Sequence, residues 1–249
     1  MELGLKGKAA IVCGASSGLG LAAAEAIAEE GADVAMLARR RDELERHAER
    51  IGALAVRGDV TNAADLERLV DRTVRAFGGV DIVVWNSGGP PAAPAREIDD
   101  DRLERAFELL LLPAVRLVRL TLPHLERSKA GRIVFITSIA AREHVPQLAL
   151  SNTLRPGLTG FAKSLARDLG PAGITVNCVA PGRIDTPRMT ELYGENGLPA
   201  AEIAEIPLGR LGAPREFGDV VCFLASSRAS YVSGTTIAVD GGSTRALLL

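Results

Sequence analysis

Three glycines lie close together near the amino terminus, in the segment 14–20 with the sequence GASSGLG. Residues without a Cβ permit a tight turn, let a phosphate approach the backbone, and let a following helix pack closely on a sheet. A helix that begins here would point its free N–H groups and the positive end of its dipole at the phosphates. The alternative is a packing turn without a ligand. We predict a turn that binds the pyrophosphate of a dinucleotide through Gly14, Ser16, Ser17, Gly18, Leu19 and Gly20.

Arginines follow the apolar run 33–38, where the sequence continues with Arg39, Arg40 and Arg41. A site for NAD normally has an Asp or Glu here for the ribose hydroxyls, whereas a cationic side chain accommodates the 2′-phosphate of NADP. Arg39 and Arg40 therefore favour NADP(H) over NAD(H); a solvated charged face is the alternative. Asp59 and Val60 close the third apolar run, where the adenine ring would lie.

Four ordered motifs resemble those of the short-chain dehydrogenase/reductase family, and the likeness covers nearly the whole chain. Segment 13–20 is similar to the family's Thr-Gly-x-x-x-Gly-x-Gly turn, with Cys13 replacing Thr. Residues 85–88 (WNSG) resemble its Asn-Asn-Ala-Gly segment, 181–182 (PG) its turn after the sixth strand, and 239–242 (VDGG) its closing motif. The resemblance implies a nicotinamide cofactor and the interconversion of carbonyls and alcohols. It implies cofactor contacts at Asn86, Gly88, Pro181, Gly182, Ile184 and Thr186, the last two at the nicotinamide carboxamide.

The resemblance also implies a carbonyl-polarising Ser, a Tyr as general acid/base, and a Lys four residues after the Tyr. Ser138 matches the Ser, but the Tyr position holds Ser151 and the Lys position holds Arg155. The position of a supporting Asn falls at Leu110. We therefore expect Ser138 to polarise a carbonyl, Arg155 to hold the nicotinamide ribose, and Ser151 to relay a proton through water. Pro156 predicts a helix that is kinked here or that begins later than in typical relatives.

A substitute proton donor is required because a serine hydroxyl is far less acidic than a tyrosine, and an arginine stays protonated. His144 is the best candidate, since imidazole titrates near neutrality; the alternative is a solvent-exposed loop side chain. The only tyrosines, Tyr193 and Tyr231, have no lysine four residues later. Tyr193 is a weaker candidate that we expect to pack over the ligand.

Three functional hypotheses follow from these residues. The leading one is an NADP(H)-dependent oxidoreductase that acts on a small carbonyl or alcohol with an atypical active site. The second is a cofactor-binding protein without turnover, acting as a redox sensor or as a partner in an oligomer. The third is a different reaction on the same cofactor, with His144 as the base.

The elements that must position these residues alternate along the chain. Short apolar runs predict strands at 9–13, 33–38, 54–56, 81–85, 132–137, 174–179 and 236–239. Helical patterns occupy 19–30, 43–50, 63–77, 102–125, 158–169 and 215–225. Continuous apolar strands suit a sheet covered on both faces. We predict one α/β domain over residues 1–249, a three-layer Rossmann-like, doubly wound parallel sheet of about seven strands that binds its ligand at the carboxyl ends.

The segment 183–212 is rich in Pro, Gly and acidic residues, and a loop of this length usually acts as a lid or binding loop. We expect one or two short helices within it. At the helix ends, Gly31 can take a left-handed conformation, Thr61 or Asn62 can cap the third helix, and Pro214 can begin the last.

Composition narrows the class of protein. The 29 basic and 31 acidic residues give a formal charge of −2, so we expect no nucleic-acid partner. No apolar run approaches the roughly 20 residues of a membrane span, and residues 1–14 do not resemble a signal peptide. The three cysteines lack metal-like spacing, so we predict buried thiols, no metal site and a cytoplasmic location. Apolar stretches at 107–112 and 148–150 could support a homodimer or homotetramer, although core packing explains them equally well. Residues 247–249 could pack on a neighbouring subunit.

Overall fold

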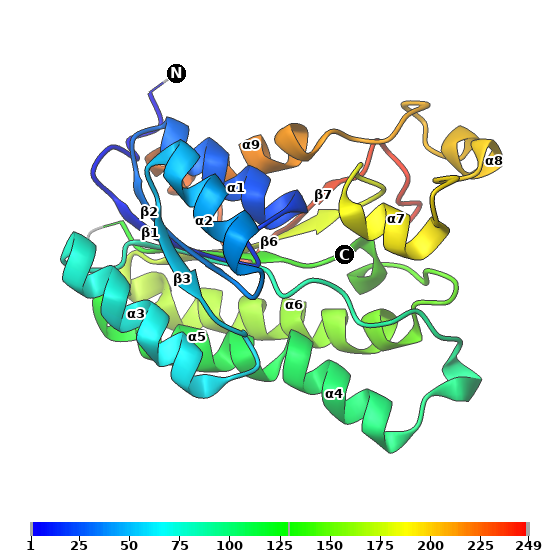
Figure 1. Cartoon of the computed structure of the whole chain (residues 1–249), viewed down its shortest axis with the longest axis horizontal. Coiled ribbons are helices and arrows are strands. Elements are labelled where there is room, and N and C mark those ends of the chain that lie inside the picture. The colour runs from blue at the N-terminus through cyan, green and yellow to red at the C-terminus, as the bar shows by residue number, and fades with distance from the viewer. Residues whose placement is uncertain (1, 129, 248–249) are drawn as a thin grey trace.

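The computed structural model describes residues 2–128 and 130–247 (Figure 1). These residues form a seven-stranded sheet in the order β3-β2-β1-β4-β5-β6-β7, and all the neighbouring strands are parallel. The strands are β1 (Ala9–Cys13), β2 (Asp33–Ala38), β3 (Leu54–Arg57), β4 (Ile82–Trp85), β5 (Arg132–Ile136), β6 (Thr175–Pro181) and β7 (Thr236–Val239). The strand order reverses between β1 and β4, and such a switch point is where doubly wound sheets bind ligands. The predicted fold class is confirmed.

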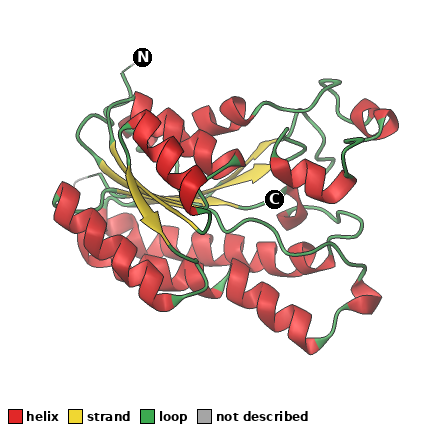
Figure 2. Ribbon diagram, viewed as in Figure 1, coloured by secondary structure: helices red, strands yellow, loops and turns green. Residues whose placement is uncertain are grey.

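Helices cover both faces of this sheet, so the molecule has three layers (Figure 2). The α-helices are α1 (Gly18–Glu29), α2 (Arg41–Ile51), α3 (Ala63–Phe77), α4 (Asp100–Leu110), α5 (Leu112–Leu125), α6 (Ala149–Leu169), α7 (Pro187–Tyr193), α8 (Ala200–Ala204) and α9 (Pro214–Ala225). Short 3-10 helices occupy Ala95–Glu97, Ile139–Ala141, Gly170–Ala172 and Ser227–Ala229. Figure 1 shows α1, α2 and α9 on one face and α3, α5 and α6 on the other.

Each face of the sheet has its own apolar core, and β1 supplies both. Ala10 and Val12 belong to the core under α1 and α9, whereas Ile11 and Cys13 belong to the core under α3, α5 and α6. Successive side chains of a strand point to opposite faces, which is why a strand buried on both sides has an uninterrupted apolar sequence. Burial raises the pKa of the Cys13 thiol to about 12. The cysteines form no disulfide within the described part of the chain.

The residues predicted to begin and end helices occupy those positions in the structure. Asn62 Oδ1 accepts a hydrogen bond from the N–H of Ala64 at 2.9 Å, which caps α3. Gly31 has φ +83° directly after the turn that ends α1. Pro214 occupies the first turn of α9, where its missing N–H would have no helical partner.

Two helix predictions are wrong. The pattern at 102–125 is two helices, because the chain breaks at Leu111 (φ −113°, ψ −55°). Pro113 follows the break and lies in the first turn of α5, where its missing N–H costs no helical hydrogen bond. The helix predicted at 158–169 begins at Ala149, so it does not start after Pro156. Leu150, Leu154 and Leu158 are buried on α6, and this packing offsets the hydrogen bond that the proline removes.

The segment 183–212 contains the two short helices α7 and α8, as expected. In Figure 1 they lie beyond the end of the sheet where the strands finish, with α7 near the C-terminal end of the chain and α8 farther out. Leu247 is 97% exposed, and the predicted packing of Leu248 and Leu249 falls outside the described residues. Among residues 2–128 and 130–247, no helix is both long and apolar enough to cross a membrane.

Candidate cofactor and active site

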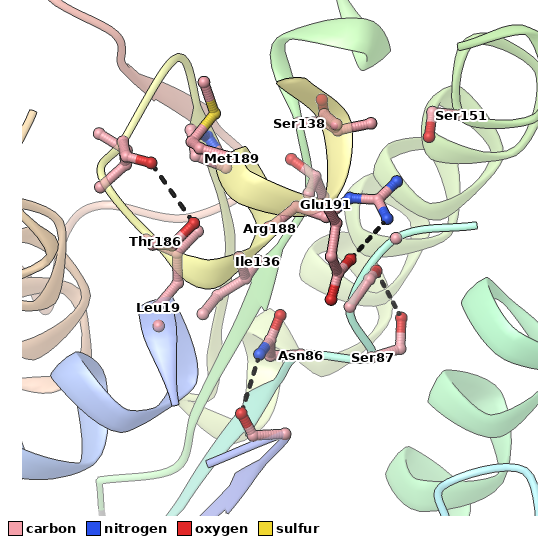
Figure 3. Close-up of a pocket in the computed structure, with 18 of the residues that line it drawn as sticks. Leu19, Asn86, Ser87, Ile136, Ser138, Ser151, Thr186, Arg188, Met189 and Glu191 are labelled. Atoms are coloured by element: carbon pink, nitrogen blue, oxygen red, sulfur yellow. Dashed lines mark hydrogen bonds and ion pairs between the residues drawn. The ribbon is translucent and has the colours of Figure 1, made fainter. Parts of the chain in front are cut away.

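A cavity of about 910 Å³ opens at the carboxyl ends of the strands. Its walls come from the turn after β1, the ends of β2 to β6, the start of α6, the helix α7 and the segment after β7. Figure 3 shows part of this cavity, with Arg188 and Glu191 extending from α7 and Asn86 directed at the turn after β1. One cavity therefore joins the glycine-rich turn to the residues predicted for the reaction.

The glycine-rich turn is built so that no side chain fits at its closest points. Gly14 has φ +61°, and a Cβ there would lie 2.7 Å from Asn86 Nδ2. Asn86 Nδ2 donates a hydrogen bond to the Gly14 carbonyl oxygen at 3.3 Å, which ties the end of β4 to the turn. A Cβ on Gly20 would lie 2.3 Å from that same oxygen, so Gly20 does not line the cavity but lets α1 approach β1. The turn and the first residues of α1 thus line the cavity with glycines and serines and with no large side chain except Leu19.

Two arginines follow β2, and they lie differently. Arg40 Nη2 donates to Ser17 Oγ at 2.5 Å and to Ser16 Oγ at 3.3 Å, while its Nη1 pairs with Glu43 at 2.9 Å. The Arg39 side chain is 79% exposed and lies 4.0 Å from an Asp59 carboxylate oxygen. Arg40 is therefore the cation directed at the turn, and Arg39 lies over the Asp59 end of the cavity.

The serines predicted for the reaction both line the cavity. Ser138 follows β5, and its Oγ accepts the N–H of Ala140 at 3.1 Å, so its hydroxyl hydrogen can be donated elsewhere. Ser151 lies in the first turn of α6, is 5% exposed, and forms no side-chain hydrogen bond with the described residues. The two hydroxyls come from neighbouring walls of the cavity (Figure 3).

Arg155 lies one helical turn after Ser151 and is 5% exposed. Its Nη1 donates to the Ile136 carbonyl oxygen at 3.0 Å, and its Nη2 donates to the Gly88 carbonyl oxygen at 2.5 Å. Burial, reinforced by the positive charge of Arg188, lowers the pKa of Arg155 to about 10. The side chain stays cationic at neutral pH and joins the ends of β4 and β5.

Helix α7 carries a second arginine into the cavity. Arg188 Nη1 pairs with Glu191 at 2.9 Å, and its Nη2 donates to the Pro90 carbonyl oxygen at 2.6 Å. Behind it, Arg183 Nη2 and the Tyr193 hydroxyl both bond Glu202 Oε2, at 2.8 and 3.1 Å. Burial raises the pKa of Tyr193, so its hydroxyl is protonated at neutral pH. These bonds hold α7 and α8 together over the cavity.

His144 lines the cavity but is exposed to solvent. The neighbouring Glu143 accepts the backbone N–H of Arg245 at 2.9 Å, which brings the chain after β7 to the cavity wall. Leu110, which the sequence comparison with the family predicted at the position of the supporting Asn, is fully buried and apolar. Tyr231 is fully exposed and does not line the cavity.

The cavity therefore brings together nearly all of the residues predicted from the sequence. The ones that line it are Gly14, Ser16, Ser17, Gly18, Leu19, Arg39, Arg40, Asp59, Val60, Asn86, Gly88, Ser138, His144, Ser151, Arg155, Pro181, Gly182, Ile184 and Thr186. Sequence reasoning missed Arg188 and Arg245. Arg188 follows Thr186 and a proline directly, so its place in the same turn was a usable signal. Arg245 lies in a segment whose course past the cavity had no sequence signal.

Comparisons with known proteins agree with this architecture. Residues 14–244 match the family model described as "Enoyl-(Acyl carrier protein) reductase". The chain is 35% identical to the 3-oxoacyl-[acyl-carrier-protein] reductase of Vibrio cholerae, over 96% of this chain and 98% of that protein. It is 33% identical to the dehydrogenase/reductase SDR family member 4 of Caenorhabditis elegans, over 95% of each chain.

A solved structure is similar over the same length. The L-sorbose reductase of Gluconobacter frateurii, complexed with NADPH and L-sorbose, superposes with a TM-score of 0.93 at 33% identity and covers 99% of this chain and 100% of that one. Family model, relatives and solved structure all span the cavity and both halves of the sheet. The chain therefore belongs to the short-chain dehydrogenase/reductase family of oxidoreductases, and its Rossmann-type fold is of the NADP-binding kind.

Proposed function

We propose that this protein is an NADP(H)-dependent oxidoreductase that interconverts a small carbonyl compound and its alcohol, with Ser151 and Arg155 at the positions where the family carries Tyr and Lys. The observation that carries the proposal is the single cavity that joins the Gly14–Gly20 turn to Ser138, Ser151 and Arg155. A binding turn without a reaction chamber would not need hydroxyls and a buried cation on the opposite wall.

The chain's own residues suit the cofactor. The glycine cradle and the N-terminus of α1 would bind the pyrophosphate, and Arg40, already bonded to Ser16 and Ser17, would meet a 2′-phosphate. Ile184 and Thr186 would hold the carboxamide. When bound, the cofactor supplies or accepts the hydride. The NADPH in the L-sorbose reductase complex supports the preference for NADP(H).

The reacting group would be handled by side chains that position and polarise it. Ser138 would donate its hydroxyl hydrogen to the carbonyl oxygen, because that oxygen gains negative charge in the transition state. Ser151 would pass a proton through water, and His144, at the solvent-exposed rim, would exchange it with bulk water. Arg155 would hold the cofactor ribose and remain charged throughout.

The proposal is tested by nicotinamide absorbance with NADPH and NADP⁺ across a broad panel of carbonyls and alcohols. The double variant Ser151→Tyr, Arg155→Lys runs beside the wild type, and isothermal titration calorimetry measures cofactor affinity. We expect wild-type turnover that depends on NADPH, with the double variant about 10²–10⁴ times faster once a general acid is present.

The second candidate function, a cofactor-binding sensor without turnover, is favoured by the lack of a general acid on α6. The sensor function is supported if the wild type binds NADPH but shows no turnover while the double variant is active. The third hypothesis, a different reaction on the same cofactor with His144 as the base, is supported only if His144→Ala abolishes an existing activity. Failure of the wild type to bind NADPH contradicts all three.

We also propose a cytoplasmic location and a homodimer or homotetramer. The buried thiols suit a reducing compartment. Leu103 and Phe107, each 40% exposed on α4, are large apolar side chains that a subunit interface would cover. Analytical ultracentrifugation tests the assembly, and a monomer at micromolar concentration contradicts it.

A further inference from the structure

Arg155 is a buried cation without an anion. Among the residues that the structure describes, no carboxylate pairs with it, and its Nε has no hydrogen-bond partner at all. A guanidinium has five N–H groups, and the carbonyls of Ile136 and Gly88 take two of them. Leaving a buried cation and its remaining donors unpaired costs free energy. The described part of this cavity wall therefore lacks an anionic group that would pair with Arg155.

The charge nearest to Arg155 is another cation. Arg188 comes from the lid helix α7 and holds the same loop, since Arg155 bonds the carbonyl of Gly88 and Arg188 bonds that of Pro90. The Arg188 guanidinium packs so closely on Gly89 that a Cβ there would lie 3.1 Å from Nε. Two guanidiniums therefore grip the Gly88–Pro90 loop, two residues apart, and both border the cavity.

The internal partner of Arg188 shows what chemistry this wall accepts. Glu191 extends into the cavity from the same helix and presents its carboxylate to Arg188 Nη1 at 2.9 Å (Figure 3). The Glu191 side chain is 64% exposed, so this pair is weak and easily exchanged. A carboxylate thus already occupies one side of a cationic wall whose other cation, Arg155, has none.

We propose that Arg155 and Arg188 form an oxyanion subsite, so the substrate is a carbonyl or hydroxy compound that also carries a carboxylate or a phosphate monoester. The planar guanidinium fork matches either group. This inference rests on the proposed function for the reacting group, but the anion subsite itself is a binding property of the chain. Arg188 would act as a substrate-binding residue, with Glu191 as its displaceable internal competitor.

The test uses three inert ligands of one chain length: pentanoate, pentyl phosphate and the neutral pentanamide. Ligand-detected NMR titrations are run on NADPH-saturated and on cofactor-free protein. We expect at least one of the two anions to bind about tenfold more tightly than pentanamide, the size of one charge-assisted hydrogen bond. Whichever anion binds more tightly identifies the group that the substrate carries.

Variants separate this subsite from general electrostatics. Arg188→Gln should abolish the preference over the amide, and Glu191→Gln should tighten anion binding about threefold by removing the competitor. Arg245→Gln, a cavity arginine on another wall, is the matched control and should change anion affinity less than about twofold. Arg155→Lys keeps the charge, loses the fork, and should weaken anion binding severalfold.

Equal affinities of all three ligands, or no binding of either anion, would overturn the inference. So would an Arg188→Gln variant that loses NADPH affinity but keeps its anion preference, because Arg188 would then serve the cofactor and not the substrate. An equal loss of anion affinity in Arg245→Gln would also contradict the subsite, because it would show that the anion responds to the overall positive charge of the cavity. If the wild type fails to bind NADPH, the proposed function fails, and the cofactor-free titration still decides this inference.

Discussion

The cavity has two halves, which we propose hold the nucleotide and the reacting group, and they are built by different means. The nucleotide half is made by backbone: Gly14 and Gly20 leave room for each other and for Asn86, and any side chain at either position would collide with main-chain or amide atoms. The reaction half is made by side chains on α6, α7 and the segment after β5, namely Ser138, Ser151, Arg155 and Arg188.

This difference explains which half can diverge. A backbone cradle is coupled to the packing of α1 on β1 and on β4, so a change there disturbs the fold. A side chain that only borders the cavity can be exchanged while the helix that carries it stays in place. This agrees with the proposal that the chain keeps the family's glycine turn and differs from the family pattern at Ser151 and Arg155.

The largest expected effect tests the rigid half. Gly20→Ala would place a Cβ 2.3 Å from the Gly14 oxygen, so α1 must move away from the turn. We expect NADPH affinity to fall about a hundredfold and the free energy of unfolding to fall by about 3 kcal/mol. Calorimetric titration and urea denaturation measure the two.

Gly160→Ala is the matched control, because a Cβ there meets nothing within 4 Å in the middle of α6. It should leave NADPH affinity unchanged and raise stability by about 1 kcal/mol, the difference in helix propensity. A Gly20→Ala protein that bound NADPH normally would remove the contrast between the halves.

The next effect belongs to the exchangeable half. Ser138→Ala should lower turnover about a hundredfold by removing a donor to the carbonyl oxygen. NADPH affinity should stay within about twofold, and the lost bond to Ala140 should cost about 1 kcal/mol of stability. Steady-state kinetics and thermal denaturation check this, with Ser164→Ala on the exposed side of α6 as the control. A parallel loss of cofactor affinity would show that the halves are coupled.

A smaller effect distinguishes the arginines after β2. Arg40→Gln should weaken NADPH binding about tenfold and leave NADH binding unchanged, because only NADPH carries the phosphate that Arg40 would meet. Arg39→Gln should weaken NADPH binding less, since its side chain is 79% exposed. Fluorescence titrations of each variant with NADPH and with NADH give the dissociation constants relative to the wild type. Equal weakening of NADPH and NADH by Arg40→Gln would assign Arg40 to the turn's structure instead.

The smallest effect is expected where the segment 183–212 joins α9. Arg210 and the N–H of Ala213 hold the pKa of Glu216 at about 2, below its ordinary 4.5. Because the folded value is the lower one, the stabilisation is present above about pH 4.5 and is lost as the pH falls towards 2. Glu216→Gln should therefore have a slightly lower Tm than the wild type at pH 7, and the difference should shrink on acidification. Glu67→Gln on α3 is the control, and a gap that widened in acid would contradict the assignment.

Much of the fold could be predicted because local patterns carry it. Apolar runs predicted β1, β2 and β7 to the residue. In β1 and β2, burial on both faces leaves no polar alternation, whereas β7 is an edge strand that is only partly buried. The break at Leu111 and the start of α6 at Ala149 were missed because they depend on competition between proline and the packing of buried leucines. Such a balance is a tertiary quantity.

The candidate site shows the same division. Gly14 and Thr186, which line the cavity, could be predicted because each lies inside a contiguous motif. The different roles of Arg39 and Arg40 could not be predicted, since adjacent residues differ only in where their side chains lie. The meeting of Arg188 with the Gly88–Pro90 loop joins segments about a hundred residues apart and depends on the folded lid.

The order of the strands has a consequence for how the protein is made. β1 pairs with β2 and β4, so the sheet of the nucleotide half is complete once Trp85 has left the ribosome, whereas the far edge waits for β7. The helix α9, which covers α1, is synthesised late. Gly218 of α9 lies so close to Ala22 of α1 that a Cβ on Gly218 would be 2.5 Å from the Ala22 carbonyl oxygen. Until α9 has been synthesised, a nascent chain therefore lacks the helix that covers the alanine face of α1. We expect this intermediate to be the species that chaperones meet during synthesis.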